Sequence, residues 1–389
     1  MRSATQSPTD PNFIRNPYPF YAGLRANGDF AFWEELQVPV AVTHAAVNSV
    51  LADPRFKRQP PNETASQQAA SVSHLYGSPT QLSNSNGTAN IRALIETAFS
   101  LERIQYLAPE ISRKTDTLIE DFSDAPFDLV ERFAAPLSIC VIVRMLGVPC
   151  YMAPMLQSWS QELYAATEDK LEGIPQIENA KVDREFAAYM REFLQVKTGL
   201  PGQDLTSDLL RKQQSGELSE GEIIAACMAL LFSAHEATVN AIATAARSLI
   251  NYENSAAALT PEHISATVEE CLRYDPPLQM LVRYTQEDTR LEEYLFAKGT
   301  KVGCLVGSAC RDDAIWVNSE RFDPFRRPRN TMVFGVENNQ CLGASTIRLV
   351  LQIALPILFS RCPSLNITDP PTFQSNLPFR RLKTLIVET

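Results

Sequence analysis

The residues that most often carry enzyme chemistry are sparse in this sequence and do not form the common catalytic motifs. The glycines form neither GxGxxG nor a P-loop, so the usual nucleotide-binding loops are missing. His235-Glu236 begins like the zinc motif HExxH, but Val239 occupies the place of the second histidine. No GxSxG elbow occurs, and the four histidines are too widely spaced for a metal cluster. The chemistry is therefore expected to come from a bound cofactor.

One cysteine lies in a glycine-containing segment towards the C-terminal end of the sequence. Residues 334–343 read FGVENNQCLG, so Cys341 lies between Gly335 and Gly343. A thiolate is a soft metal ligand, and glycine permits close approach and positive φ angles. The alternative is that Cys341 is one buried thiol among the eight cysteines, which is a common fate of free cysteine.

Three further segments precede the cysteine segment. Residues 233–238, SAHEAT, lie in a long apolar pattern, and Glu236 is their acid. Glu270 and Arg273 are three residues apart, which puts them on one face of a helix. Residues 319–324 read SERFDP. An ion pair at this spacing is weak evidence alone, because many helices carry one on their surface. The order of all four segments is much more informative.

In this order the segments resemble those of the cytochrome P450 family of haem-thiolate enzymes, and the resemblance covers nearly the whole chain. Residues 334–343 resemble the family's cysteine loop, FGxGx[HR]xCxG. This implies that Cys341 is the axial ligand of the iron of haem b, iron protoporphyrin IX. The resemblance also implies a mainly α fold with small β-sheets, the cytochrome P450 fold. Residues 1–389 would form one large triangular helical domain that encloses the haem.

The resemblance further implies which residues hold the cofactor and its loop. Glu270, Arg273 and Arg321 correspond to a structural triad that holds the cysteine loop under the haem. Arg92 and Arg283 occupy positions that the family uses for the haem propionates, since buried carboxylates need charged partners. The alternative for Arg92 is a solvated arginine on a helix. The other residues expected at the cofactor are Phe334, Gly335, Asn339 and Gly343.

Residues 233–238 resemble the family's distal-helix motif, [AG]Gx[DE]T[TS], with one change. Glu236 keeps the acid, but Ala237 replaces the alcohol, and Thr238 is turned about 100° further round the helix. Glu236 and Thr238 are the expected catalytic residues, with proton delivery through water or through a hydroxyl group of the substrate. The alternative is that Glu236 only lines a kink in the helix. The side chains expected to face the substrate form a mostly apolar wall: Phe232, Ser233, Ala234, Ala237, Leu278, Gln279 and Leu281.

The function implied by the resemblance is a monooxygenase-type oxidoreductase that oxidises a small organic molecule of secondary metabolism. O₂ would be the oxidant, and electrons would come from a ferredoxin or flavodoxin with its reductase, since the sequence has no flavin or iron–sulfur segment. The basic residues 326–329 either face such an acidic partner or are simply solvated. Four residues depart from the family pattern: Thr88, Ala237, Glu337 and Asn339. They leave open oxidative coupling, peroxide-driven oxidation, dehydration and a non-catalytic haem-binding scaffold.

Helical periodicity predicts the elements that must position these residues. Thr43 is a predicted N-cap, and Ser219 with Glu222 forms a predicted capping box. Residues 30–41 predict a small two-stranded sheet, and the chain beyond Leu278 predicts short strands and a last hairpin. Helices are predicted over residues 17–27, 44–52, 90–122, 137–146, 152–170, 182–196, 204–214, 219–251, 261–274 and 342–361.

The composition limits the class of protein. The chain has 389 residues and a net charge of −10, so it lacks the basic footprint of a general nucleic-acid binder. No signal-like segment begins the sequence, and charges within residues 228–250, the longest apolar stretch, favour a buried helix over a membrane span. The eight cysteines form no CxxC pair, which is typical of reduced, mostly buried thiols in a cytoplasmic protein. The polar residues 59–90 predict a long loop that covers the substrate.

Overall fold

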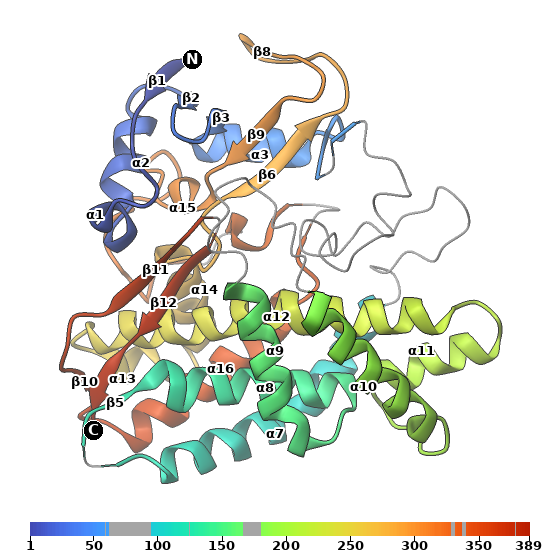
Figure 1. Cartoon of the computed structure of the whole chain (residues 1–389). Helices are drawn as coiled ribbons and strands as arrows, with labels where there is room; N and C mark the ends of the chain where they lie inside the picture. Colours follow the sequence, from blue (N-terminus) through green and yellow to red (C-terminus); the bar gives the residue numbers. More distant parts are fainter. Residues whose placement is uncertain are drawn as a thin grey trace.

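The computed structural model has a helical part and a β-rich part (Figure 1). The long helices lie together at one end of the molecule, and most strands of the largest sheet lie at the other. The predicted class, mainly α with small sheets, is confirmed. The structure describes residues 1–58, 60–61, 95–123, 125–165, 180–327, 331–336, 340–377 and 379–389.

The helices of the described residues lie close to the predicted ones. α3 (His44–Ala52) coincides with its prediction, and the Thr43 hydroxyl oxygen accepts a hydrogen bond from the amide of Ala46. The start of the helix predicted over 90–122 lies outside the described residues, residues 95–96 are helical, and a 3₁₀ turn (Thr97–Phe99) separates them from α7 (Leu101–Glu120). The remaining helices apart from the longest are α1 (Pro11–Arg15), α2 (Tyr18–Arg25), α8 (Ala135–Leu146), α9 (Ala153–Ala165), α10 (Ala180–Thr198), α11 (Leu205–Gln214), α13 (Ser255–Ala258), α14 (Ile264–Tyr274), α15 (Val306–Ala309) and α16 (Ala344–Arg361).

The longest helix, α12 (Glu220–Ile250), runs through the middle of the helical part (Figure 1). Its predicted capping box is confirmed. Ser219 Oγ accepts a hydrogen bond from the amide of Glu222 at 3.3 Å, and the Glu222 carboxylate accepts one from the amide of Ser219 at 2.8 Å. By length and composition α12 and α16 could each cross a membrane, but 72% of the apolar window of α12 and 44% of that of α16 are buried inside the protein. α12 packs against α8, α14 and α16, so it is a core helix here, as predicted for residues 228–250.

The largest sheet is larger than the sequence predicts. β2 and β3 pair antiparallel as expected for residues 30–41, but β1 joins β2 in parallel and β9 joins β3 in parallel. The prediction of a two-stranded sheet was too small, because the added strands come from distant parts of the chain that local alternation cannot reveal. In order across the sheet, the strands are β1 (Arg2–Ala4), β2 (Phe30–Trp33), β3 (Val38–Ala41), β9 (Lys301–Cys304), β6 (Leu281–Thr285) and β4 (Phe56–Lys57).

A C-terminal hairpin connects the two parts of the molecule. β11 (Thr372–Asn376) pairs antiparallel with β12 (Phe379–Thr384), which confirms the predicted last hairpin. β12 packs on α12, and Figure 1 shows the hairpin running from the β-rich part down to the helical part. The other strands are β5 (Phe127–Asp128), β7 (Thr289–Leu291), β8 (Tyr294–Phe296), β10 (Asn366–Ile367) and β13 (Ile386–Glu388). Of the predicted substrate-covering loop, all but residues 60–61 lie outside the described residues.

Candidate active site

The cysteine loop starts at the short η4 turn (Met332–Phe334) and leads into α16. Gly335 has a φ of +79°, which confirms the positive angle predicted there. The amide of Cys341 donates a hydrogen bond to the carbonyl oxygen of Phe334 at 2.7 Å and so closes the loop on itself. Gly343 has a φ of −75°, an ordinary helical value, so the special angle predicted there is wrong.

The Cys341 thiol differs from most other cysteines in its exposure. Cys341 and Cys150 are exposed, and Cys140 is half-buried. The prediction of mostly buried thiols holds for the other five: Cys227, Cys271, Cys304, Cys310 and Cys362. The alternative of Cys341 as a buried core thiol is therefore excluded. A thiol at an open position beside a closed turn is able to ligate a metal without disturbing the core.

An arginine on α16 ties the cysteine loop to α14. The Phe334 ring is buried, and the guanidinium carbon of Arg348 lies 4.7 Å from its centroid. Arg348 also forms an ion pair with Glu269, with its Nη2 donating to Glu269 Oε2 at 3.1 Å. Sequence reasoning missed both Arg348 and Glu269, because neither belongs to a motif. Together they fix the start of the loop between two helices.

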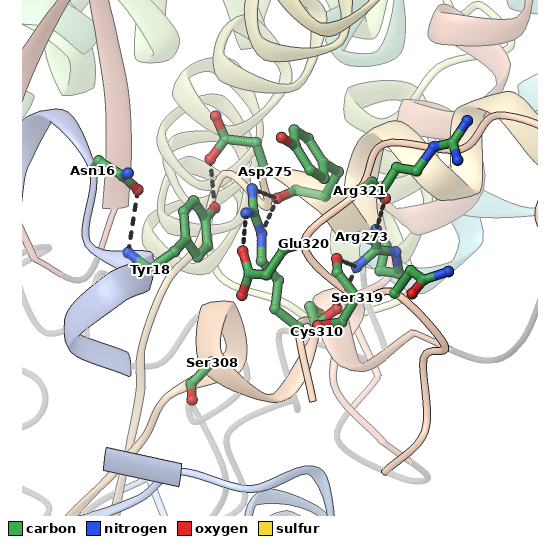
Figure 2. A network of polar contacts seen from close by, with 12 residues as sticks. Asn16, Tyr18, Arg273, Asp275, Ser308, Cys310, Ser319, Glu320 and Arg321 are labelled. Carbon is green, nitrogen blue, oxygen red and sulfur yellow. Dashed lines mark hydrogen bonds and ion pairs between the residues drawn. The ribbon is translucent and has the colours of Figure 1, made fainter. Parts of the chain in front are cut away.

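The Glu270–Arg273 pair on α14 is buried and bidentate. Arg273 Nε and Nη2 donate to the two carboxylate oxygens of Glu270 at 2.7 and 2.8 Å. Arg273 Nη1 donates to the carbonyl oxygens of Cys310 and Ser319 at 2.7 and 2.9 Å (Figure 2). The predicted pair is therefore formed, and it is a buried anchor for the chain that leads to the cysteine loop.

The third member of this cluster is Arg326 rather than Arg321. Arg326 Nε donates to Glu270 Oε2 at 3.2 Å. Arg321 contributes only its backbone carbonyl, which accepts from Arg273 Nη2 at 3.2 Å, while its side chain is exposed and points away from Arg273 in Figure 2. The assignment of Arg321 to the triad was wrong, because the turn that follows it brings the side chain five residues later back to Glu270.

A buried arginine on β6 has hydrogen-bond donors that no described group accepts. Arg283 is 2% exposed, and its Nη1 donates to the carbonyl oxygen of Val282 at 2.8 Å. Its Nε and Nη2 have no partner among the described residues. Burial lowers the pKa of Arg283, which shows how poorly the protein alone compensates its charge. An anionic group such as a haem propionate fits these two donors. Arg92, the other predicted propionate contact, and Asn339, also expected at the cofactor, lie outside the described residues, as do Thr88 and Glu337.

One face of α12 is open in its middle. Ser233 is exposed, and Ala234 and Ala237 are half-buried, although most of their neighbours on the helix are buried. Ser233 and Ala237 are one turn apart, so they lie on the same face. Leu278 and Leu281, from the segment after α14, are also half-buried. These five predicted substrate residues are therefore available for contact with a ligand.

Two other predicted substrate residues are packed inside the protein. Phe232 is buried, with its ring centroid 6.2 Å from that of Phe186 on α10. Gln279 is buried too, and its Nε2 donates to the carbonyl oxygen of Pro276 at 2.8 Å and to the hydroxyl of Tyr18 at 3.4 Å. Neither side chain is open to a ligand in this structure, because neighbouring elements supply close packing partners that the sequence does not display.

The predicted acid, Glu236, is buried on α12 and paired with an arginine. Arg381 Nε on β12 lies 3.2 Å from Glu236 Oε2. Burial raises the pKa of Glu236, and the Arg381 charge opposes that rise. The neighbouring His235 is bound to Ser138 Oγ on α8, and its burial, with a contribution from Arg381, lowers its pKa to about 3. Thr238, the second predicted catalytic residue, is buried as well.

Comparison with known proteins gives a consistent result. A sequence model of the family described as cytochrome P450 matches residues 141–376. The "Biotin biosynthesis cytochrome P450" of Bacillus subtilis is 30% identical over 362 residues, which cover 92% of each chain. The "Cytochrome P450 monooxygenase PikC" of Streptomyces venezuelae is 30% identical over 392 residues, or 96% of this chain and 91% of that one. The solved structure of P450BioI in complex with hexadec-9Z-enoic acid ligated acyl carrier protein has a TM-score of 0.84 at 29% identity, and the match covers 97% of this chain and 99% of that one.

An exposed thiol beside a hydrogen-bonded turn, and a buried guanidinium with two donors that no described residue accepts, are both expected of the haem-thiolate oxidoreductases. The fold agrees with that class over nearly the whole chain. The chain belongs to the cytochrome P450 family, and it is a haem-dependent oxidoreductase of the monooxygenase type. The resemblance seen in the motifs is thereby confirmed for the fold, the cofactor and the class of enzyme.

Proposed function

We propose that this P450 hydroxylates a small organic intermediate of a biosynthetic pathway, and that Glu236 delivers protons without the usual neighbouring alcohol. The observation that carries the proposal is that Glu236, a buried acid, is followed directly by Ala237, which lies on the open face of α12 and has no hydroxyl group. One relative, named for biotin biosynthesis, supports a biosynthetic role, and another, named as a monooxygenase, supports the type of reaction. Residues 1–389 are proposed to act as one domain, in the cytoplasm and without a membrane or nucleic acid.

The substrate is proposed to be mainly apolar where it meets α12. Among the open residues, Ala234, Ala237, Leu278 and Leu281 are apolar, and Ser233 already donates its hydroxyl to the carbonyl oxygen of Ala229 at 2.6 Å. None of these five side chains is charged, so burying a charged group of the substrate against them would cost free energy. The fatty-acyl ligand of the structural neighbour P450BioI is consistent with such a substrate.

The cofactor roles follow from the geometry of the described residues. Haem bound at this site would supply the activation and cleavage of O₂. Cys341 would ligate its iron, and Arg283 would donate its two unpartnered hydrogen-bond donors to a propionate. Glu270 and Arg273 would hold the chain that leads to the loop, with Arg326 as the third member. Phe334 and Gly335 would shape the turn.

Proton delivery would rest on Glu236 and on water. Ala237 brings no hydroxyl to the position that the family gives to an alcohol. Thr238 is buried one position further round the helix, so any part it plays would require an intervening water. General acid help is typically worth about 10²–10⁴-fold, so the loss of Glu236 should be measurable. The electrons are proposed to come from a ferredoxin or flavodoxin with its reductase.

The test uses the purified holoenzyme with NADH, a ferredoxin, its reductase and a panel of fatty-acyl and polyketide compounds. Compounds that shift the haem spectrum are incubated under ¹⁸O₂. One labelled oxygen atom in the product is expected, and Ala237→Thr should change the ratio of product formed to O₂ consumed. Products that lack the label, or that form only with peroxide, would favour coupling, dehydration or peroxide-driven chemistry. Tight binding without any product would favour a haem-binding scaffold.

A further inference from the structure

The C-terminal hairpin places an arginine directly on the distal acid. Arg381 Nε lies 3.2 Å from Glu236 Oε2, and Arg381 Nη1 donates to Gln374 Oε1 on the paired strand at 2.9 Å. Gln374 and Arg381 face each other in the register of β11 and β12. The guanidinium therefore spans from the neighbouring strand to the acid on α12. The contact with Glu236 is an ion pair rather than a hydrogen bond, because Glu236 Oε2 accepts no hydrogen bond from the described residues.

The strand that carries Arg381 is fixed on both sides of it. The amide of Leu382 donates to Asn240 Oδ1 at 3.2 Å, one turn beyond Glu236 on α12. Arg380 is buried and donates to Asp275 Oδ1 at 2.8 Å and to the carbonyl oxygen of Ile14 at 2.7 Å. Asp275 is also held by the hydroxyl of Tyr18 at 2.6 Å (Figure 2). Three consecutive residues of β12 thus dock independently, so the hairpin cannot slide past α12 without breaking several contacts.

The only charged group that shifts the pKa of Glu236 among the described residues is Arg381 on the C-terminal hairpin. Burial raises the pKa of Glu236, and the Arg381 charge lowers it. The other groups at this level do not replace that charge. His235 has a pKa lowered to about 3 and is neutral near pH 7, α8 contributes the uncharged Ser138, and Arg380 is engaged with Asp275. Without Arg381, Glu236 would be a buried acid with no cation beside it among the residues that the structure describes.

We propose that Arg381 is a positioning residue that fixes Glu236 on the hairpin side of α12 and keeps the acid able to release its proton there. The inference rests on the proposed role of Glu236 in proton delivery. A buried carboxylic acid without a cation holds its proton too tightly to donate it at neutral pH. The Arg381 side chain is 19% exposed, so the partner of the buried acid lies at the boundary with solvent, from which the proton must be replaced.

The proton balance is that of the monooxygenase reaction. O₂ and the substrate, with two electrons and two protons, give the hydroxylated product and one water. The electrons come from NADH through the electron-transfer protein. Glu236 releases a proton to the oxygen being reduced and regains one from solvent, so it ends each cycle unchanged. Arg381 neither gains nor loses a proton, because a guanidinium stays charged throughout the working pH range.

The first test measures the acid itself rather than the reaction. Infrared difference spectra of the holoenzyme across a pH titration report the protonated carboxyl band, which Glu236→Gln assigns by its loss. Removing an adjacent positive charge should raise the midpoint by about 1–3 pH units in Arg381→Gln. Arg381→Lys, which keeps the charge, should raise it less. Lys383→Gln is the matched control, because Lys383 is exposed on the same strand, and it should leave the midpoint unchanged. An unchanged midpoint in Arg381→Gln overturns the proposal.

The second test measures proton delivery with NADH, ferredoxin and reductase through the rate of O₂ consumption. A group that donates its proton works below its pKa, so the alkaline limb of the pH–rate profile should move upward in Arg381→Gln. Its plateau should fall about tenfold, because a weaker acid transfers its proton more slowly. Gln374→Ala should give a smaller change of the same kind and covers the case in which Arg381→Gln does not bind haem. If Glu236→Gln slows O₂ consumption but neither Arg381→Gln nor Gln374→Ala does, the proposal falls and the proposed function stands. If Glu236→Gln has no effect, the proposed role of Glu236 fails, and this inference with it.

Discussion

Arg326, and not Arg321, completes the buried cluster with Glu270 and Arg273, and this finding predicts how the two arginines differ in their effect on stability. We compare Arg326→Ala with Arg321→Ala, two changes that remove the same side chain five residues apart. Arg326 donates to the Glu270 carboxylate at 3.2 Å and to the carbonyl oxygens of Val317, Asn318 and Arg321 at 2.6, 3.3 and 3.2 Å. The Arg321 side chain is exposed and supplies none of these contacts.

The expected magnitude follows from the burial of the two partners. Removing one partner of a buried ion pair costs about 3–5 kcal/mol. The Arg326 side chain is 14% exposed, and Glu270 keeps its two bonds from Arg273, so we expect the low end, about 3 kcal/mol. A surface change such as Arg321→Ala should stay within about 0.5 kcal/mol.

The assay is urea unfolding of the purified holoenzymes, followed by circular dichroism, together with the haem bound per polypeptide. Arg326→Ala should unfold at a lower urea concentration and bind less haem, because the chain that leads to the cysteine loop loses its anchor. Arg321→Ala should match the unchanged protein in both measurements. If Arg321→Ala proves as damaging as Arg326→Ala, the assignment of the third residue is mistaken.

Two other predictions concern single buried groups. Arg283→Gln should weaken haem binding by about 10–150-fold, since a hydrogen bond to a charged group is worth about 1.5–3 kcal/mol. Haem transfer to an acceptor protein measures this, with Arg290→Gln, at the exposed position of β7, as the control. An unchanged transfer rate would remove Arg283 from the cofactor site. His235, whose pKa is lowered to about 3 from an ordinary value of 6.5, stays neutral in the folded state while the unfolded chain takes up a proton, so stability should fall as the pH drops from about 6.5 towards 3. In that window His235→Asn should remove a slope of about 1.4 kcal/mol per pH unit from the free energy of unfolding, and a slope that survives the change would contradict the buried neutral state.

The sequence is a good guide where structure is decided locally. The Thr43 cap, the Ser219–Glu222 box and the Glu270–Arg273 pair depend on residues a few positions apart, and all are found as predicted. The same holds for the α3 bounds. These features follow from helix geometry, which fixes distances between near neighbours.

Predictions failed where distant segments meet. The third arginine of the buried cluster depends on the path of a turn, so the side chain that reaches Glu270 could not be read from the motif alone. Gln279 looked available for a substrate, but Tyr18, 261 residues away in the sequence, accepts its amide. The link from Arg381 to Glu236 joins the last hairpin to the middle of α12, and no sequence pattern announces it. Such pairings need the tertiary fold.

The central claim is that the Cys341 thiolate ligates the haem iron, and one spectrum tests it most directly. Reduced holoenzyme with carbon monoxide should show the Soret band characteristic of a thiolate ligand. Cys341→Ala should lose that band, whereas Cys150→Ala, which removes the other exposed cysteine of the described residues, should keep it. A thiolate-type band that persists in Cys341→Ala would contradict the account.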